Sequence, residues 1–126
     1  PSARWRGLQR SRRAALNRGE VWSLSLDTPA AKNDAQSRLV IILSSDALAV
    51  LPLRVVVPLM AWHDDYNTIP WLVRIPPVLT SGLSEVMAAD ALQVRSVNRT
   101  RLINRLGNLP QRITDQVAAA VNEINS

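Results

Sequence analysis

The amino-acid sequence predicts a mainly β, α+β fold: a small, strongly bent sheet or partly open barrel with one amphipathic helix packed on it at the C-terminal end. Three observations predict it. Two apolar runs rich in β-branched residues occupy the middle of the chain, several shorter runs are joined by turns, and a clear helical pattern follows residue 110. Strands that come first and a helix that comes last indicate an antiparallel sheet covered by that helix.

The two apolar runs are expected to be central strands. Residues 38–45 read RLVIILSS, a run that is too short for a helix and nearly all apolar, so it is predicted to be a strand buried on both faces. Residues 53–60 form the matching strand. Pro58 has no backbone N–H to donate, so we expect an edge, a bulge or the end of the strand there.

The remaining elements follow from shorter patterns. Residues 20–26 alternate in polarity, which predicts a half-exposed first strand. Polar loops are expected at 30–37 and 61–69, a helical turn at 46–49, strands at 71–75 and within 86–97, a strand or turn at 98–102, and a break in the chain at 107–108. Pro110 suits the first turn of a helix. Apolar residues then recur at helical spacing, at Ile113, Val117, Ala120, Val121 and Ile124.

Composition limits the function classes. The 126 residues suit one domain, and no apolar run approaches the ~20 residues of a membrane span. The chain has no cysteine and one histidine, which argues against a disulfide framework and against a multi-histidine metal site. We therefore expect no metal, no cofactor, no membrane association and a cytoplasmic location.

The basic charge is concentrated in an N-terminal arm, residues 1–17, which carries five arginines and no acidic side chain. The other ten basic side chains balance ten acidic ones, so the net charge of +5 belongs to the arm. Basic arms can bind nucleic acid, but this one has few apolar residues to fold around, and we expect a solvated, partly disordered extension. Residues 18–126 are expected to form the folded domain.

Four segments together resemble the MazF/PemK toxin family. They are 18–22 (RGEVW) with Asp27, 38–44 (RLVIILS), 56–60 (VVPLM) and 93–102 (QVRSVNRTRL), in the family's order and spacing. The resemblance implies an SH3-like small barrel of the CcdB/PemK type that forms a homodimer. It also implies a toxin that cleaves single-stranded RNA at specific sequences without metal, and an antitoxin whose acidic, disordered tail fills the groove.

Arg38 matches the family's catalytic arginine. Cleavage without metal uses the 2′-hydroxyl of the RNA as the nucleophile, so the protein must stabilise the negative charge that develops around phosphorus. An arginine stays charged and can hold two phosphate oxygens at once. Arg38 also comes directly before a rigid strand and directly after a polar loop, which is a suitable place for this task.

Met60 stands where the family carries a hydroxyl-bearing residue, and a thioether has no proton to give. One hypothesis is that another group substitutes, the candidates being His63, Tyr66, Thr68 and Ser45. His63 suits proton transfer near neutral pH, although a loop of this composition is equally typical of a solvated turn. The alternative is a catalytically impaired toxin-fold protein that still binds RNA, an antitoxin or a gyrase-type target.

The expected RNA-binding residues lie in the two polar loops and before the final helix. They are Lys32, Asn33, Asp34, Gln36, Tyr66, Gln93 and Arg95. Tyr66 can stack on an unpaired base, which is the usual way to hold single-stranded RNA. The strand patterns place Trp22 and Trp71 in the core instead. The neighbouring Asp64 and Asp65 are too few to make a metal site, and the arginines at 99, 101 and 105 are expected to be surface charge.

Overall fold

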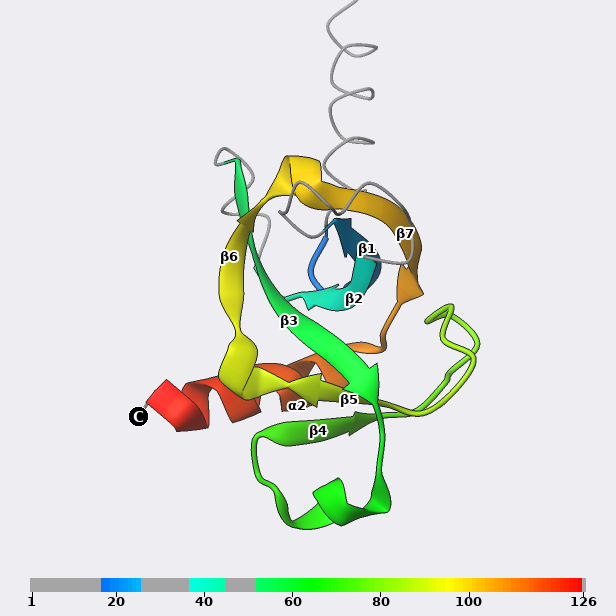
Figure 1. The fold of residues 1–126 in the computed structure, drawn as a ribbon, viewed down its shortest axis with the longest axis vertical. Helices are drawn as coiled ribbons and strands as arrows, with labels where there is room; N and C mark the ends of the chain where they lie inside the picture. The colour runs from blue at the N-terminus through cyan, green and yellow to red at the C-terminus, as the bar shows by residue number, and fades with distance from the viewer. Residues whose placement is uncertain (1–16, 26–36, 45–51, 126) are drawn as a thin grey trace, which may run out of the picture.

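The computed structural model describes residues 17–25, 37–44 and 52–125, and these residues form a mainly β, α+β fold with a C-terminal helix, as predicted (Figure 1). The strands are β1 (Glu20–Ser25), β2 (Ser37–Ile42), β3 (Leu53–Ala61), β4 (Leu72–Ile75), β5 (Met87–Asp90), β6 (Arg95–Asn98) and β7 (Leu102–Asn108). The described residues also form three short 3-10 helices, η3 (Asp64–Thr68), η4 (Ala91–Gln93) and η5 (Arg99–Arg101), and one α-helix, α2 (Gln111–Asn125). No described helix is long and apolar enough to span a membrane.

The sheet is antiparallel, in the order β4-β5-β3-β2-β1-β7, with β6 added beside β3. Strand β3 bends the sheet because it changes neighbours: Leu53–Val56 pair with β6, whereas Leu59–Ala61 pair with β5. Pro58 lies in the gap between these two ladders, where the missing N–H removes no hydrogen bond to β5 or β6. The strand does not end at Pro58 but continues to Ala61.

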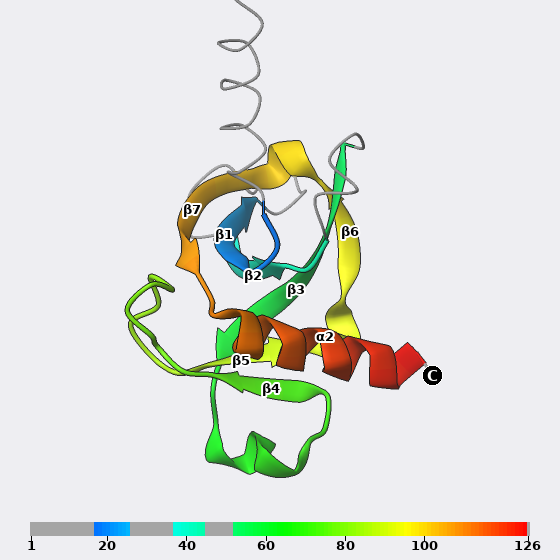
Figure 2. The same cartoon turned by 180° about the vertical axis from the view of Figure 1, so that it is seen from behind.

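Two apolar cores lie on opposite faces of this sheet. The first packs the sheet against α2 and includes Val21, Ile41, Val57, Leu59, Ile75, Ala89, Leu109, Ile113 and Val117. The second is enclosed by β1, β2, β3, β6 and β7 and consists of Trp22, Leu24, Val40, Ile42, Val56, Val97 and Leu102. In Figure 1, β6 and β7 arch around β1 and β2, and Figure 2 shows α2 lying across β5 on the other side of the molecule.

The C-terminal helix begins where the sequence indicates. Pro110 directly precedes α2, and its carbonyl oxygen accepts hydrogen bonds from the N–H groups of Ile113 (3.0 Å) and Thr114 (3.1 Å). Ile113 and Val117 are fully buried against the sheet, and Val121 packs at the edge of the same core. The helical spacing therefore predicts the buried face of α2 correctly at Ile113, Val117 and Val121, but not at its end, where Ile124 is exposed.

Three predictions about the sheet are wrong. Strand β1 is not half-exposed, because it lies between β2 and β7 and has a core on each face. Trp71 is not in the core, since 38% of it is exposed just before β4. Gly107 does not break the chain but is paired with Val21 inside β7. A Cβ at position 107 would collide with the backbone carbonyl of Thr80, so glycine is required there by a close approach of two segments.

Candidate active site

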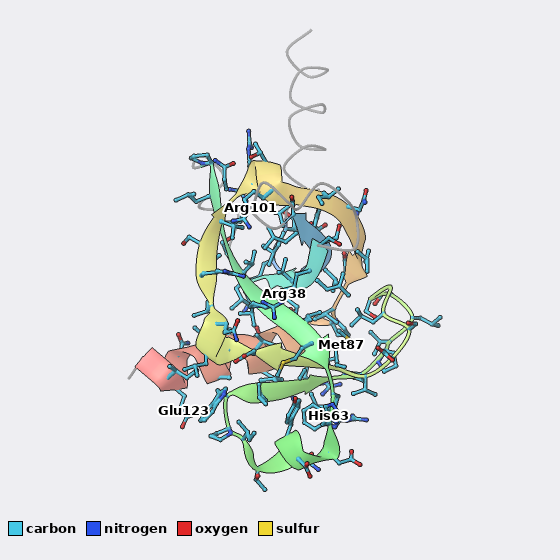
Figure 3. The ribbon with its side chains drawn as sticks, in the orientation of Figure 1. Arg38, His63, Met87, Arg101 and Glu123 are labelled. Atoms are coloured by element: carbon cyan, nitrogen blue, oxygen red, sulfur yellow. The ribbon has the colours of Figure 1, made fainter. Side chains whose placement is uncertain are left out.

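Arg38 lies near the start of β2, opposite Leu24 of β1, and its side chain is partly exposed. Within the described residues it forms no ion pair and no hydrogen bond. In Figure 3 its side chain lies beside the middle of β3. A guanidinium group held by a central strand, partly open to solvent and without a carboxylate partner among the described residues, is available to an anionic ligand.

Met60 lies on the same face of the sheet as Arg38. The β2–β3 ladder ends at the pair Val40 and Pro58, and Arg38 and Met60 each lie two residues beyond that pair on their own strand. Met60 is partly buried and pairs on its other side with Ala88 of β5. The residue that replaces the expected hydroxyl group therefore belongs to the same small region of the surface as the arginine.

The orientation of this region follows from the strand alternation. The neighbouring residues Leu39 and Leu59 point into the core under α2. Successive side chains of a strand point to opposite faces, so Arg38 and Met60 face away from α2. The same face carries Val40 and Ile42 in the second core, which places Arg38 at the rim of that core.

Gln93 and Arg95 are exposed beside this face. Gln93 is the last residue of η4, and Arg95, the first residue of β6, lies opposite Val56 of β3. Since Val56 and Val97 both belong to the second core, Arg95 is on the same face as Arg38. The structure thus brings two of the expected cations to one face, on two strands that flank β3.

His63, Trp62 and Tyr66 form a separate aromatic group at the end of β3. The ring of Tyr66 meets that of Trp62 edge-on, with centroids 5.7 Å apart, and that of His63 at 5.4 Å. His63 is exposed and precedes η3, and Figure 3 shows it beyond the end of β3, near β4. In the described part of the chain no hydrogen bond joins His63 to Arg38, and no group orients the imidazole for proton transfer. Thr68 is exposed at the end of η3.

Several expected site residues lie outside the described residues: Lys32, Asn33, Asp34, Gln36 and Ser45. The predicted turn at 46–49 and most of the arm also lie there.

Two of the arginines expected to be surface charge have structural partners instead. Arg101 donates two hydrogen bonds, from Nε (3.0 Å) and Nη2 (2.8 Å), to the carbonyl oxygen of Ser25. Arg105 forms an ion pair with the buried Glu20, with Nε and Oε2 separated by 3.2 Å. Sequence reasoning also missed Arg74 of β4, which lies on the face of Arg38; only the strand register could have revealed it.

The fold and the site define a class of protein: a small bent antiparallel barrel with a C-terminal helix and, at the start of a buried strand, an arginine that has no ion pair within the described ranges. No curated protein sequence matches the chain. A family model does, over residues 17–125, and its description is "PemK-like, MazF-like toxin of type II toxin-antitoxin system". The chain belongs to this family.

Solved structures show the same fold. A MazE–MazF complex from Deinococcus radiodurans (Form-III) is similar with a TM-score of 0.69 and 23% identity, covering 88% of this chain and 96% of that one. An endoribonuclease from a mycobacterial species has a TM-score of 0.65 and 20% identity, with 86% and 89% covered. A mycobacterial endoribonuclease in complex with its cognate antitoxin has a TM-score of 0.64 and 18% identity, with 86% and 91% covered.

Proposed function

We propose that this protein is the toxin of a toxin–antitoxin pair and a sequence-specific endoribonuclease that cleaves single-stranded RNA without metal. The observation that carries the proposal is Arg38: a partly exposed arginine on a rigid strand, without an ion pair among the described residues, on the face of the sheet that α2 leaves free. Membership of the MazF-like family supports it.

The chemistry follows from what Arg38 can do. The 2′-hydroxyl of the RNA attacks the adjacent phosphorus, the bond to the 5′-oxygen of the next nucleotide breaks, and a 2′,3′-cyclic phosphate and a 5′-hydroxyl result. The guanidinium group of Arg38 holds two non-bridging phosphate oxygens and stabilises the negative charge that grows on them. A proton must leave the 2′-hydroxyl and another must reach the 5′-oxygen, and Met60 can carry out neither transfer.

The position of Met60 favours a second candidate function. Met60 lies on the face of Arg38, at the position where the family resemblance implies a hydroxyl group, so that group is missing from this face. His63 and Tyr66 could take over proton transfer if the RNA or the chain brings them to the phosphate. If none does, the protein is a binding protein that holds RNA, an antitoxin or a gyrase-type target and cleaves poorly.

A cleavage assay separates the two functions. The purified protein is incubated with an end-labelled single-stranded RNA of mixed sequence, with and without a chelator. We expect cyclic-phosphate products in both conditions and none from RNA methylated at every 2′-oxygen. Arg38→Ala should reduce the rate roughly 100- to 1,000-fold, whereas Arg112→Ala, an exposed arginine on α2, should not reduce it. Absence of cleavage by the unaltered protein, together with measurable RNA binding, would establish the binding function instead.

The expected macromolecular partners belong to the same proposal. Structures similar to this one include a MazF with MazE and an endoribonuclease with its cognate antitoxin. We propose an antitoxin with an acidic, disordered tail, because carboxylates can compete with phosphate for Arg38 and Arg95. We also propose a homodimer that acts in the cytoplasm, where its RNA substrate is.

A further inference from the structure

Arg74 is an exposed arginine on β4, the strand at one edge of the sheet. No acidic side chain in the described ranges forms an ion pair with it, and it donates no hydrogen bond within them. It thus resembles Arg38 in being a cation whose side chain has no partner among the residues that the structure describes, and it differs from Arg101 and Arg105, which are held by the protein itself.

The strand register places Arg74 on the same face as Arg38. Arg74 is directly opposite Ala88 of β5, and Ala88 is directly opposite Met60 of β3. Met60 and Arg38 each lie two residues beyond the last pair of the β2–β3 ladder, Val40 with Pro58, and share its face. We call Arg38, Met60, Ala88 and Arg74 the arginine row. Residues directly opposite each other share a face, so all four belong to the face that α2 does not cover.

An independent observation supports this orientation. The adjacent row, one residue along each strand, consists of Leu39, Leu59, Ala89 and Val73, and all four pack in or against the core under α2. Because side chains alternate, the arginine row must point the other way. In Figure 1 this face of β3, β5 and β4 is turned to the viewer, and α2 lies behind it.

The dimensions of the row suit an extended strand of RNA. Neighbouring strands lie about 4.8 Å apart, so the Cα atoms of Arg74 and Met60 are separated by two spacings, roughly 10 Å, and Arg38 lies further on, on β2. Between them lie Met60, which is partly exposed, and Ala88, which is buried and uncharged. Asp90 lies two residues beyond Ala88 on this face, and its carboxylate accepts a hydrogen bond from the N–H of Leu92 (3.2 Å). Two cations flank a short uncharged segment.

We propose that Arg74 is a second phosphate-binding residue, which holds a different phosphate of the RNA strand whose scissile phosphate is on Arg38. The single strand then runs from Arg38 to Arg74 across the face of β3 and β5, with a nucleoside over the partly exposed Met60. This inference rests on the proposed RNA-binding function. It assigns to Arg74 a positioning role: it fixes the register of the RNA relative to Arg38 and does not take part in the bond-breaking step.

The salt dependence of RNA binding tests the proposal. The full-length protein is titrated into a fluorescein-labelled, mixed-sequence 2′-O-methyl RNA, and anisotropy is measured at several salt concentrations. Each phosphate contact with a single strand contributes about 0.7 to the slope of log K against log salt. We expect Arg74→Gln to reduce the slope by about 0.7 and the double variant Arg38→Gln/Arg74→Gln to reduce it by about 1.4. Arg112→Gln, which removes the same charge from α2, should leave the slope unchanged.

The possible outcomes distinguish a failure of the proposed RNA-binding function from a failure of the role proposed for Arg74. If the unaltered protein does not bind this RNA, the proposed function itself fails. If Arg38→Gln lowers the slope but Arg74→Gln behaves like Arg112→Gln, RNA binding at Arg38 stands and the role of Arg74 is refuted. If the double variant loses no more slope than either single variant, both arginines hold one phosphate, and the proposed course of the strand is refuted.

Discussion

The two faces of the strands β2, β3, β5 and β4 differ in chemistry although their residues are adjacent in sequence. One face carries the row Leu39, Leu59, Ala89 and Val73, which packs in or against the core covered by α2. The other carries the arginine row, with an unpaired cation at each end among the described residues. A shift of one residue along each strand separates the most apolar layer of the molecule from its candidate active site.

This difference shows that one strand register fixes both the core and the site. A slip of one residue would turn Arg38 and Arg74 towards α2. Burying two cations without partners is strongly unfavourable, so the shifted register would be much less stable than the observed one. The row of Leu39, Leu59, Ala89 and Val73, here called the apolar row, therefore fixes the register that keeps the two arginines on the other face. Variants that affect one row but not the other can test this division of tasks.

The largest effect is expected at Leu59, the buried leucine of the apolar row. Leu59→Ala removes a nearly fully buried side chain and leaves a cavity, so the free energy of unfolding should fall by about 2–5 kcal/mol. Urea unfolding followed by tryptophan fluorescence measures the loss, since Trp22 is buried in the barrel.

Met60→Ala is the matched control, because Met60 is the next residue and faces the other way. Its side chain is partly exposed and belongs to neither core, so its loss should cost less than half as much. An equal cost for the two substitutions would mean that the face of the arginine row is also a packed interior, contrary to the structure.

The second effect concerns catalysis at the other face. Met60→Thr restores a hydroxyl group on the face of Arg38, and a positioned proton-transfer group contributes roughly 100-fold or more to rate. We expect the cleavage rate to rise by about that factor, with little change in the urea midpoint. Ala61→Thr, which adds the same hydroxyl one residue further on the opposite face, is the control and should leave the rate unchanged. If the unaltered protein cleaves RNA, no gain in Met60→Thr would show that another group already performs the transfer.

Much of the buried side of the molecule could be predicted from the sequence. The apolar run of β2 indicates a strand with both faces buried, and Val40, Ile41 and Ile42 are buried as expected. The period of α2 identifies Ile113 and Val117 as core residues. These signals are local: they depend on burial patterns within one element, and each element here buries enough apolar surface to show its pattern.

What could not be predicted depends on contacts between distant segments. Gly107 reads as a break in the chain, yet it is required because the backbone at Thr80 approaches β7 closely. Arg74 reads as an ordinary charge on a short strand, and only the pairing of β4 with β5 and of β5 with β3 shows that it lies on the face of Arg38. Register across three strand pairs is not visible in one sequence.

Two arginines outside the arginine row, Arg105 and Arg18, differ from Arg38 and Arg74 because they form ion pairs with carboxylates of the protein. Glu20 is buried, and its Oε1 accepts hydrogen bonds from the N–H of Asn17 (2.8 Å) and from Nε1 of Trp22 (3.1 Å), while Oε2 pairs with Arg105. Glu20→Gln would present an amide N–H₂ to the Arg105 guanidinium. We expect a loss of about 1–2 kcal/mol in the free energy of unfolding, limited by the exposure of Arg105.

Urea unfolding at low and high salt measures this loss. It should persist at high salt, since a buried carboxylate is screened less than an exposed one. A loss that disappears in salt would mean that Glu20 acts only through long-range charge, and not through the three donors that surround it.

The smallest effect is expected at the exposed ion pair between Arg18 and Asp115, which joins the segment before β1 to α2 at 3.0 Å. Both side chains are well exposed, at 33% and 54%, so Asp115→Asn should change the free energy of unfolding by at most about 0.5 kcal/mol, and the change should vanish in high salt. It should also leave RNA cleavage unaltered, because α2 lies on the face opposite to the arginine row. A reduced cleavage rate in Asp115→Asn would show that the RNA also reaches the helix, and the separation of the two faces would then fail.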